Sequence, residues 1–245
     1  MGLSYKEIPR LIDISCVRTD VTYDEIKLMS HIAQKYKFVC VFAMPCFTGM
    51  LREMITDPAV MVGGVAGFPS GADTTQIKVA NAKHMVEIGC NEVDMVINVG
   101  ALKSGDYDLV KNDIEAVVKA VYPTPVKSIL EICYLTDEEV AKGAEIASNA
   151  GVTYVKTGTG WGSKPTTVDT IKIIKGVVGD KSFIKAAGGV RNLETLEAMV
   201  DAGCNRFGIS IKSALCILKE AYDREGIEFP DCELIENFDV HNAKY

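Results

Sequence analysis

Two lysines, Lys156 and Lys185, end short apolar runs and are followed by small residues rather than by polar surface residues. The segments 154–160 (YVKTGTG) and 183–189 (FIKAAGG) are both typical of a buried strand that leads into a glycine-lined pocket. Two ammonium groups at one apolar site repel each other and resist desolvation, so at least one of their pKa values should fall. The resulting neutral amine is a nucleophile suited to Schiff-base formation with a carbonyl.

The elements that would position these lysines recur along the chain as short β-rich runs separated by periodic, helix-like segments. The runs are 8–14, 38–42, 61–65, 92–96, 127–132, 154–156, 183–185 and 206–208, and the clearest helical segments are 75–88, 106–120, 137–150 and 193–202. Eight such units in 245 residues predict an α/β fold, a single-domain (β/α)8 TIM barrel over residues 1–245. An open doubly wound sheet is the alternative.

Three of these units share one plan, in which a glycine ends a helix, a two-residue loop follows and a brief strand begins. The units are 88–94, 150–156 and 202–208. The fifth residue after each glycine is Asp94, Lys156 or Gly208, and we expect each to lie at the carboxyl end of its strand. The three residues should then share the rim on which barrel active sites assemble.

The residue types at this rim match the requirements of an aldolase that forms a Schiff base. One lysine attacks the carbonyl, the other holds positive charge nearby, and Asp94 transfers protons. From the residues alone, Lys156 and Lys185 could exchange these roles. Asp13 is a candidate partner for Lys185, with a place in a loop or at the bottom of the barrel as the alternative. Lys127 either supports the proton relay or is a surface charge at the start of a strand.

Glycines also follow the last two strands of the predicted barrel, in the segments 188–192 (GGVRN) and 208–210 (GIS). Each segment opens a helix. Barrels commonly bind phosphate at this position through backbone N–H groups and a helix N-terminus. The sequence therefore predicts a phosphorylated substrate.

Composition excludes several other classes of protein. The formal net charge is −7 with basic residues spread along the chain, which disfavours a nucleic-acid partner. No segment approaches the length of a membrane span, and the start lacks an apolar signal core. The eight cysteines are therefore expected to be reduced thiols in the cytoplasm. The three histidines are far apart in sequence, so we expect neither a metal nor a His-based triad.

Four motifs together resemble the deoxyribose-phosphate aldolase family: 67–71 (GFPSG), 92–102 (EVDMVINVGAL), 155–160 (VKTGTG) and 184–191 (IKAAGGVR). The resemblance runs from about Leu11 to Leu218. It implies a class I aldolase without metal or cofactor that reversibly cleaves 2-deoxy-D-ribose 5-phosphate to acetaldehyde and D-glyceraldehyde 3-phosphate. It further implies that Lys156 is the Schiff-base lysine, Lys185 perturbs its pKa, and Asp94 relays protons.

The resemblance also implies which residues bind the rest of the substrate. The phosphate would lie on Gly160, Gly188, Gly189, Gly208 and Ser210. Thr159 is a candidate support, and Tyr245 matches a tyrosine that some members fold over the site from a C-terminal tail, here 237–245.

The sequence departs from the family pattern on the substrate-facing loops. The departures are the segment 39–45 (VCVFAMP), which lacks an asparagine directly before the proline, the absence of a His-Thr pair at 12–15, Gly158, Trp161, Lys164-Pro165 and Ile211-Lys212. They leave two alternatives open, a related Schiff-base aldolase acting on another phosphorylated sugar, and a non-catalytic barrel that binds a sugar phosphate. A homodimer or higher homo-oligomer is the default expectation for such a barrel.

Overall fold

Eight parallel strands close into a barrel in the order of the sequence. The computed structural model describes residues 2–235. The strands are β1 (Ile12–Cys16), β2 (Cys40–Ala43), β3 (Met61–Ala66), β4 (Glu92–Val96), β5 (Val126–Ile129), β6 (Tyr154–Lys156), β7 (Phe183–Ala187) and β8 (Arg206–Ile209). The barrel closes where Asp13 of β1 pairs with Gly208 of β8. The predicted (β/α)8 barrel is confirmed, and the open sheet is excluded.

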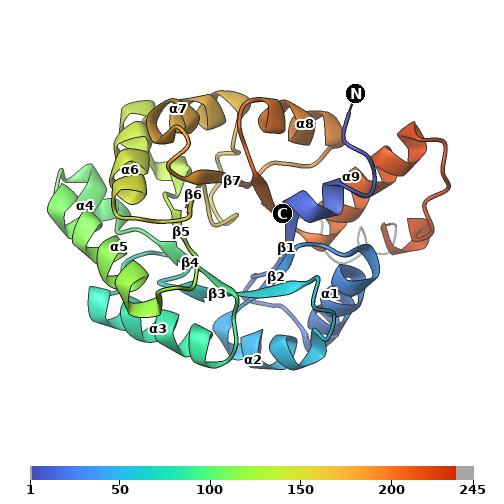
Figure 1. Ribbon diagram of the computed structural model, residues 1–245, viewed down its shortest axis with the longest axis horizontal. Helices are drawn as coiled ribbons and strands as arrows, with labels where there is room; N and C mark the ends of the chain where they lie inside the picture. Colours follow the sequence, from blue (N-terminus) through green and yellow to red (C-terminus); the bar gives the residue numbers. More distant parts are fainter. Residues whose placement is uncertain (1, 236–245) are drawn as a thin grey trace.

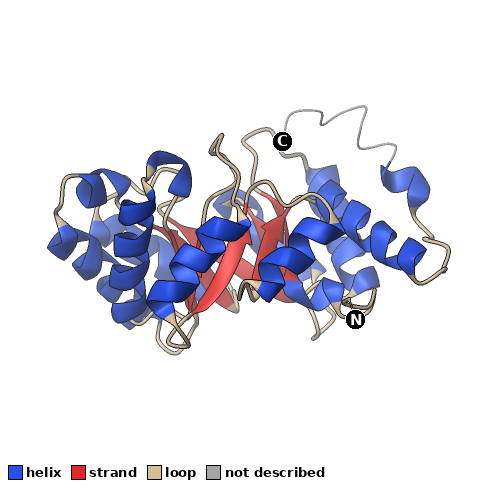
Figure 2. Cartoon of the chain, turned by 90° about the horizontal axis from the view of Figure 1, so that it is seen from above, coloured by secondary structure: helices blue, strands red, loops and turns tan. Residues whose placement is uncertain are grey.

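Helices surround the strands as an outer ring (Figure 1), and the strands lie inside this ring when the molecule is turned (Figure 2). They are α1 (Tyr23–Tyr36), α2 (Pro45–Met54), α3 (Thr75–Glu87), α4 (Val99–Lys103), α5 (Tyr107–Val121), α6 (Asp137–Asn149), α7 (Val168–Val178), α8 (Leu193–Asp201) and α9 (Ile211–Arg224), with short 3-10 helices η1 (Ile8–Leu11) and η2 (Ile132–Tyr134). Within residues 2–235, no helix combines the length and apolar composition needed to cross a membrane.

The predicted helix signals act as expected. At the start of α6, the Thr136 side chain accepts from the N–H of Glu139 while the Glu139 carboxylate accepts from the N–H of Thr136. The helices α3, α6 and α8 are each followed by a glycine with positive φ, namely Gly89, Gly151 and Gly203. Each glycine N–H, and the N–H after it, bonds back to the last helical turn, so the chain turns directly into the next strand.

Alternate residues of each strand face opposite sides of the sheet, which divides the protein into an apolar layer and a polar interior. Ile12, Ile14, Val93, Ile184 and Phe207 belong to the large hydrophobic cluster between strands and helices. Their strand neighbours face into the barrel. These inward residues include three members of a smaller apolar cluster, Cys40, Phe42 and Val65. The charged residues described below fill the rest of the interior.

Several strands begin or end at residues other than the predicted ones, and two of these differences have a clear local cause. The run 8–14 starts as the 3-10 helix η1, because Pro9 lacks an N–H for the strand ladder. The run 127–132 ends as a strand at Ile129, because Glu131 turns the backbone into the left-handed region, with φ 57°. β7 continues two residues past its predicted end at Lys185, to Ala187. β4 has its predicted bounds, but Asp94 lies in the middle of this strand and not at its carboxyl end. Strands in a closed barrel are staggered, so residues at one depth lie at different distances from their strand ends.

Candidate active site

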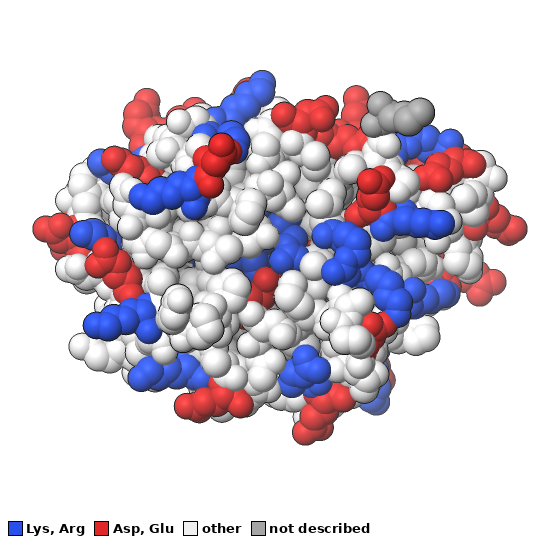
Figure 3. All heavy atoms as spheres, in the orientation of Figure 1, with Lys and Arg blue, Asp and Glu red and all other residues white. Residues whose placement is uncertain are grey.

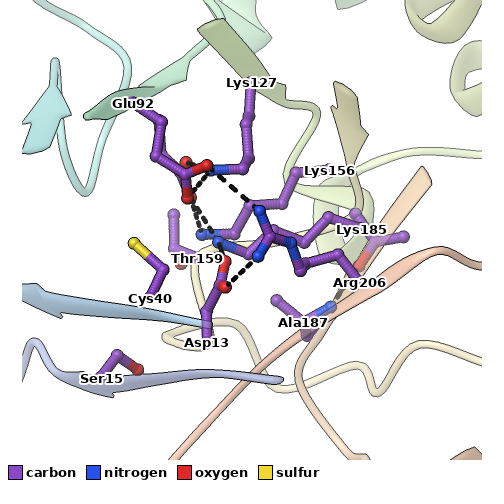
Figure 4. Close-up of polar contacts among 12 residues, drawn as sticks. Asp13, Ser15, Cys40, Glu92, Lys127, Lys156, Thr159, Lys185, Ala187 and Arg206 are labelled. Atoms are coloured by element: carbon purple, nitrogen blue, oxygen red, sulfur yellow. Dashed lines mark hydrogen bonds and ion pairs between the residues drawn. The ribbon is translucent and has the colours of Figure 1, made fainter. Parts of the chain in front are cut away.

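Seven ionisable side chains meet inside the barrel, and all are buried or nearly so; Figure 4 labels each of them except Asp94. They are the acids Asp13, Glu92 and Asp94 and the bases Lys127, Lys156, Lys185 and Arg206. They come from six different strands, β1, β4, β5, β6, β7 and β8. Closure of the barrel is what brings them together, because β1 and β8 are at opposite ends of the sequence.

Asp94 is at the centre of this group and is completely buried. Its Oδ2 accepts hydrogen bonds from Lys156 Nζ at 2.7 Å and Lys185 Nζ at 2.9 Å, and its Oδ1 lies 3.1 Å from Lys127 Nζ. Burial alone would raise the pKa of Asp94, but the three ammonium groups outweigh it and hold that pKa well below its ordinary value. Asp94 is therefore a carboxylate in the resting protein. The predicted meeting of Asp94, Lys156 and Lys185 is observed.

Lys185 and Lys127 are each held by two carboxylates. Lys185 Nζ lies 2.6 Å from Asp13 Oδ2 as well as bonding to Asp94, and Lys127 pairs with both Glu92 and Asp94. Burial acts to lower the pKa of each lysine, but the facing carboxylates prevail and raise it. Both lysines are therefore protonated. The predicted pairing of Asp13 with Lys185 is observed, and the alternative placing of Lys127 on the surface is wrong.

Arg206 completes the network from β8. Its guanidinium bridges Asp13 Oδ1 and Glu92 Oε2, each at 3.2 Å. The arginine is buried, yet these carboxylates raise its pKa further. Glu92 and Arg206 were not anticipated from the sequence, although each begins a predicted strand as a charged residue next to apolar ones.

The charges of this network determine which lysine is reactive. Three carboxylates balance three permanent cations, Lys127, Lys185 and Arg206, which leaves Lys156 as the unbalanced base. Burial, helped by the charge of Lys185 and opposed by Asp94, lowers the pKa of Lys156 to about 8. Lys156 is the lysine that can offer a neutral amine near neutral pH. The exchange of roles that the sequence left open is therefore disfavoured.

An aromatic ring covers the ammonium groups and was also not anticipated. The centroid of Phe42 lies 4.2 Å from Lys185 Nζ, 5.1 Å from Lys127 Nζ and 5.8 Å from Lys156 Nζ. A Cβ at Gly63 on the neighbouring strand would overlap this ring, so the glycine makes room for it. The ring excludes water from the lysines and attracts the closest ammonium by a cation–π interaction. Phe42 thus contributes to the desolvation of the site.

A pocket opens above the network at the carboxyl ends of the strands. Its lining residues are Asp13, Ser15, Val17, Phe42, Val65, Phe68, Lys156, Thr159, Lys185, Ala187 and Gly208. Lys156 is therefore reachable from this pocket, whereas Lys127 is not among the lining residues. A small carbonyl compound in the pocket would meet an amine that is next to a carboxylate.

The glycines expected to bind phosphate follow strands that are neighbours in the barrel. Gly160, Gly188 and Gly189 have φ of 87°, 89° and 87° in the loops after β6 and β7. Gly208 on β8 lines the pocket, where a Cβ would lie 3.0 Å from Lys185 Cε. Ser210 caps α9 and its hydroxyl accepts from the N–H of Ser213. Among these five residues, Gly208 lines the pocket, and the other four lie in the segments that follow β6, β7 and β8.

Of the two remaining predicted residues, Thr159 and Tyr245, the structure describes only Thr159. The hydroxyl of Thr159 donates to the Glu131 carboxylate and accepts from the N–H of Trp161 at 3.0 Å, so Thr159 lines the pocket with its polar atoms already bonded. Tyr245 and the segment 237–245 lie outside the described residues.

One group of potential metal ligands lies within the network. Asp13, Cys40 and Glu92 bring one ligand atom each within 4.8 Å of one another. Both carboxylates are already paired with cations. Burial and these carboxylates raise the pKa of the Cys40 thiol well above its ordinary value, so it stays protonated. The ion pairs therefore explain why these three side chains lie close together, and no metal ion is needed to explain it.

Comparisons with known proteins agree with the fold. A model of the DeoC/LacD family of aldolases matches residues 23–212. A deoxyribose-phosphate aldolase of Sinorhizobium medicae is 41% identical over 89% of this chain and 89% of its own length, and one of Caldanaerobacter subterraneus is 44% identical over 84% and 91%. The tetrameric deoxyribose phosphate aldolase of Aeropyrum pernix superimposes with a TM-score of 0.81 at 25% identity, over 91% of this chain and 94% of that one. This chain therefore belongs to the DeoC/LacD family of aldolases.

Proposed function

We propose that this protein is a class I aldolase that reversibly cleaves 2-deoxy-D-ribose 5-phosphate to acetaldehyde and D-glyceraldehyde 3-phosphate through a Schiff base on Lys156. The observation that carries the proposal is a buried lysine of lowered pKa, hydrogen-bonded to Asp94 and open to the pocket. The names of the Sinorhizobium and Caldanaerobacter relatives support the substrate.

In the proposed reaction, the neutral amine of Lys156 adds to the aldehyde carbon C1 of the substrate. Loss of water gives an iminium ion, which draws electrons from the C2–C3 bond as the C3 hydroxyl loses its proton. Glyceraldehyde 3-phosphate leaves and an enamine remains on Lys156. Protonation at C2 and addition of water then release acetaldehyde and the free amine.

Asp94 and Lys185 are proposed to support these steps differently. Asp94 is a carboxylate bonded directly to Lys156, so it can accept a proton when the amine adds and return it, through water, when water leaves. Lys185 is fixed between two carboxylates and remains a cation. It favours the neutral form of Lys156 by repulsion. Lys127 would keep Asp94 ionised and in place.

The phosphate is proposed to bind at the loops after β6, β7 and β8. Gly160, Gly188 and Gly189 offer backbone N–H groups, and Ser210, close in sequence to the pocket residue Gly208, caps the N-terminus of α9. Helix N-termini and glycine-rich loops favour anions because unpaired N–H groups point outward. This arrangement would place the aldehyde end of the substrate toward Lys156.

The proposed partners are this sugar phosphate and its aldehyde products. The net charge of −7 and the mixture of acidic and basic side chains seen on one face (Figure 3) support the absence of a nucleic-acid partner. The tetrameric Aeropyrum protein supports a homo-oligomer. No disulfide joins the eight cysteines, all of which lie within residues 2–235, and this supports a reducing compartment such as the cytoplasm.

The pKa of Lys156 predicts the pH dependence of Schiff-base formation. Because that pKa is lowered to about 8, the neutral amine is scarce well below pH 8 and predominates above it. We expect the initial rate of borohydride trapping with acetaldehyde to rise with pH, with a midpoint near 8. Trapping should be measured with hydride in excess from pH 6 to 10. A midpoint near 10.5, the ordinary lysine value, would contradict the proposed activation.

Lys185→Leu is expected to raise that midpoint. Without Lys185, three carboxylates face only Lys127 and Arg206 as permanent cations, so Lys156 becomes the cation that restores the balance. The variant also removes the repulsion between Lys185 and Lys156, and Asp94 Oδ2 no longer shares its hydrogen bonds between the two lysines. Both changes raise the pKa of Lys156 toward 10.5. The measurement is the same pH series. An unchanged midpoint would remove Lys185 from this role.

Substrate profiling tests the proposed function. The unmodified protein should cleave 2-deoxyribose 5-phosphate with equal release of acetaldehyde and glyceraldehyde 3-phosphate, each measured by a coupled dehydrogenase. Preference for another phosphorylated sugar would favour the related Schiff-base aldolase. Binding of the phosphate without turnover of any sugar would favour the non-catalytic barrel.

A further inference from the structure

Glu131, two residues after β5, has a backbone conformation that is unusual for its residue type. Its φ of 57° and ψ of 62° lie in the left-handed region, which glycine adopts freely and other residues adopt at a free-energy cost. Among residues 2–235 the only other non-glycine residue with positive φ is Lys37, on the exposed end of α1. A glutamate kept at such a position indicates that its side chain is needed there.

The Glu131 side chain is buried and reaches the loop that follows Lys156. The N–H of Thr159 lies 3.3 Å from each carboxylate oxygen, and the Thr159 hydroxyl donates to Oε2. The loop leaves room for this carboxylate at Gly158, where a Cβ would lie 3.0 Å from Oε1. The carboxylate therefore occupies the interior of the loop.

A series of hydrogen bonds connects Glu131 to residues that line the pocket. Thr159 accepts through its hydroxyl from the N–H of Trp161, and the Trp161 indole donates to the carbonyl of Val17 at 3.1 Å. Thr159 and Val17 both line the pocket. On the other side, the N–H of Ile132 donates to the carbonyl of Thr157. The Glu131 side chain thus holds the middle of the loop 157–161, while the backbone of the next residue, Ile132, holds its start.

We propose that Glu131 is a positioning residue that fixes the loop 157–161 in the conformation that receives the phosphate end of the substrate. The inference rests on the function proposed above. Glu131 would not touch the phosphate, because both are negative and the Glu131 oxygens are bonded to Thr159. It would act through the loop that contains Gly160, whose backbone is exposed and has φ of 87°.

Glu131→Gly tests this role without a backbone penalty, because glycine adopts the observed φ freely. We expect KM for 2-deoxyribose 5-phosphate to rise by about tenfold or more, as for the loss of a charged hydrogen bond. For unphosphorylated 2-deoxyribose we expect kcat/KM to stay within about twofold, since the amine of Lys156 is unaltered. Glu131→Gln retains an oxygen that can accept from Thr159 and should recover part of the loss.

Lys37→Gly is the matched control, because it makes the same backbone change at the opposite end of the barrel, before β2. Its kinetics should equal those of the unmodified protein with both sugars. Equal losses with both sugars in Glu131→Gly would overturn the proposal in favour of general structural support, and unchanged KM would overturn it outright. Failure of the unmodified protein to cleave 2-deoxyribose 5-phosphate would instead overturn the proposed function, and this inference with it.

Discussion

Lys156→Met is expected to abolish cleavage of 2-deoxyribose 5-phosphate and to leave the fold intact. Methionine keeps the unbranched shape of the side chain but offers no amine, so no Schiff base can form. The loss should appear in kcat and kcat/KM together, because the amine acts only in the chemical steps. The measurement is the steady-state rate of acetaldehyde release.

The charges of the network explain why this variant should fold. Removing Lys156 leaves three carboxylates facing three permanent cations, so no buried charge loses its only partner. We expect the melting temperature of Lys156→Met to equal or exceed that of the unmodified protein. Lys78→Met is a suitable control, because Lys78 is a buried lysine paired with Asp113 between α3 and α5. It should lower the melting temperature and leave the turnover of folded protein unchanged. Substantial turnover by Lys156→Met would refute the nucleophile assignment.

Asp94→Asn is expected to lower kcat by about 10²–10⁴-fold, the range that positioned acid–base groups contribute. It removes the carboxylate that accepts from both Lys156 and Lys185 and also pairs with Lys127. The amide cannot accept and return a proton. Because Asp94 opposes the lowering of the Lys156 pKa, its removal should also move the midpoint of amine trapping below 8. A lower kcat together with a trapping midpoint below 8 would show that Asp94 transfers protons, because the amine of Lys156 would then be more available and the reaction still slower.

The same variant should destabilise the fold, since it leaves buried cations without compensation, at a cost of about 3–5 kcal/mol. Asp113→Asn is the matched control: Asp113 is a buried carboxylate bonded to Lys78 at 2.6 Å, outside the barrel interior. It should lose stability with kcat unchanged. If Asp94→Asn also retained kcat within about threefold, the general acid–base role would be wrong.

The sequence allowed the barrel and the central residues of its candidate site to be predicted for identifiable physical reasons. Strands such as 92–96 and 154–156 agree with their predicted bounds, because apolar runs bounded by a helix-ending glycine are local signals. A lysine or aspartate inside such a run is conspicuous, since burial of a charge is costly. Asp94, Lys156 and Lys185 were identified in this way, and the structure places them in direct contact.

The residues that were missed depend on contacts between distant parts of the chain. Arg206 begins β8 and pairs with Asp13 of β1, a contact that only closure of the barrel creates. Phe42 is an ordinary strand phenylalanine until three lysines surround its ring. The left-handed backbone of Glu131 is also invisible in the sequence, because glutamate does not mark such a turn.

The balance of buried charges, rather than position along the strands, distinguishes the reactive lysine from the other two lysines of the network. Lys127, Lys156 and Lys185 are all buried in one network, and the sequence offered similar signals for the last two. The structure distinguishes them because Lys185 and Lys127 each contact two carboxylates, whereas Lys156 bonds to Asp94. Counting buried charges is therefore a means of identifying the reactive amine in such a barrel.

Covalent trapping is the most direct test of whether Lys156 forms a Schiff base with the substrate. The protein is incubated with 2-deoxyribose 5-phosphate and borohydride in the presence of a chelator, and the modified peptide is located by mass spectrometry. We expect one reduced adduct, on Lys156, that is absent from Lys156→Met. An adduct on Lys185, or no adduct while the substrate is cleaved, would contradict this expectation.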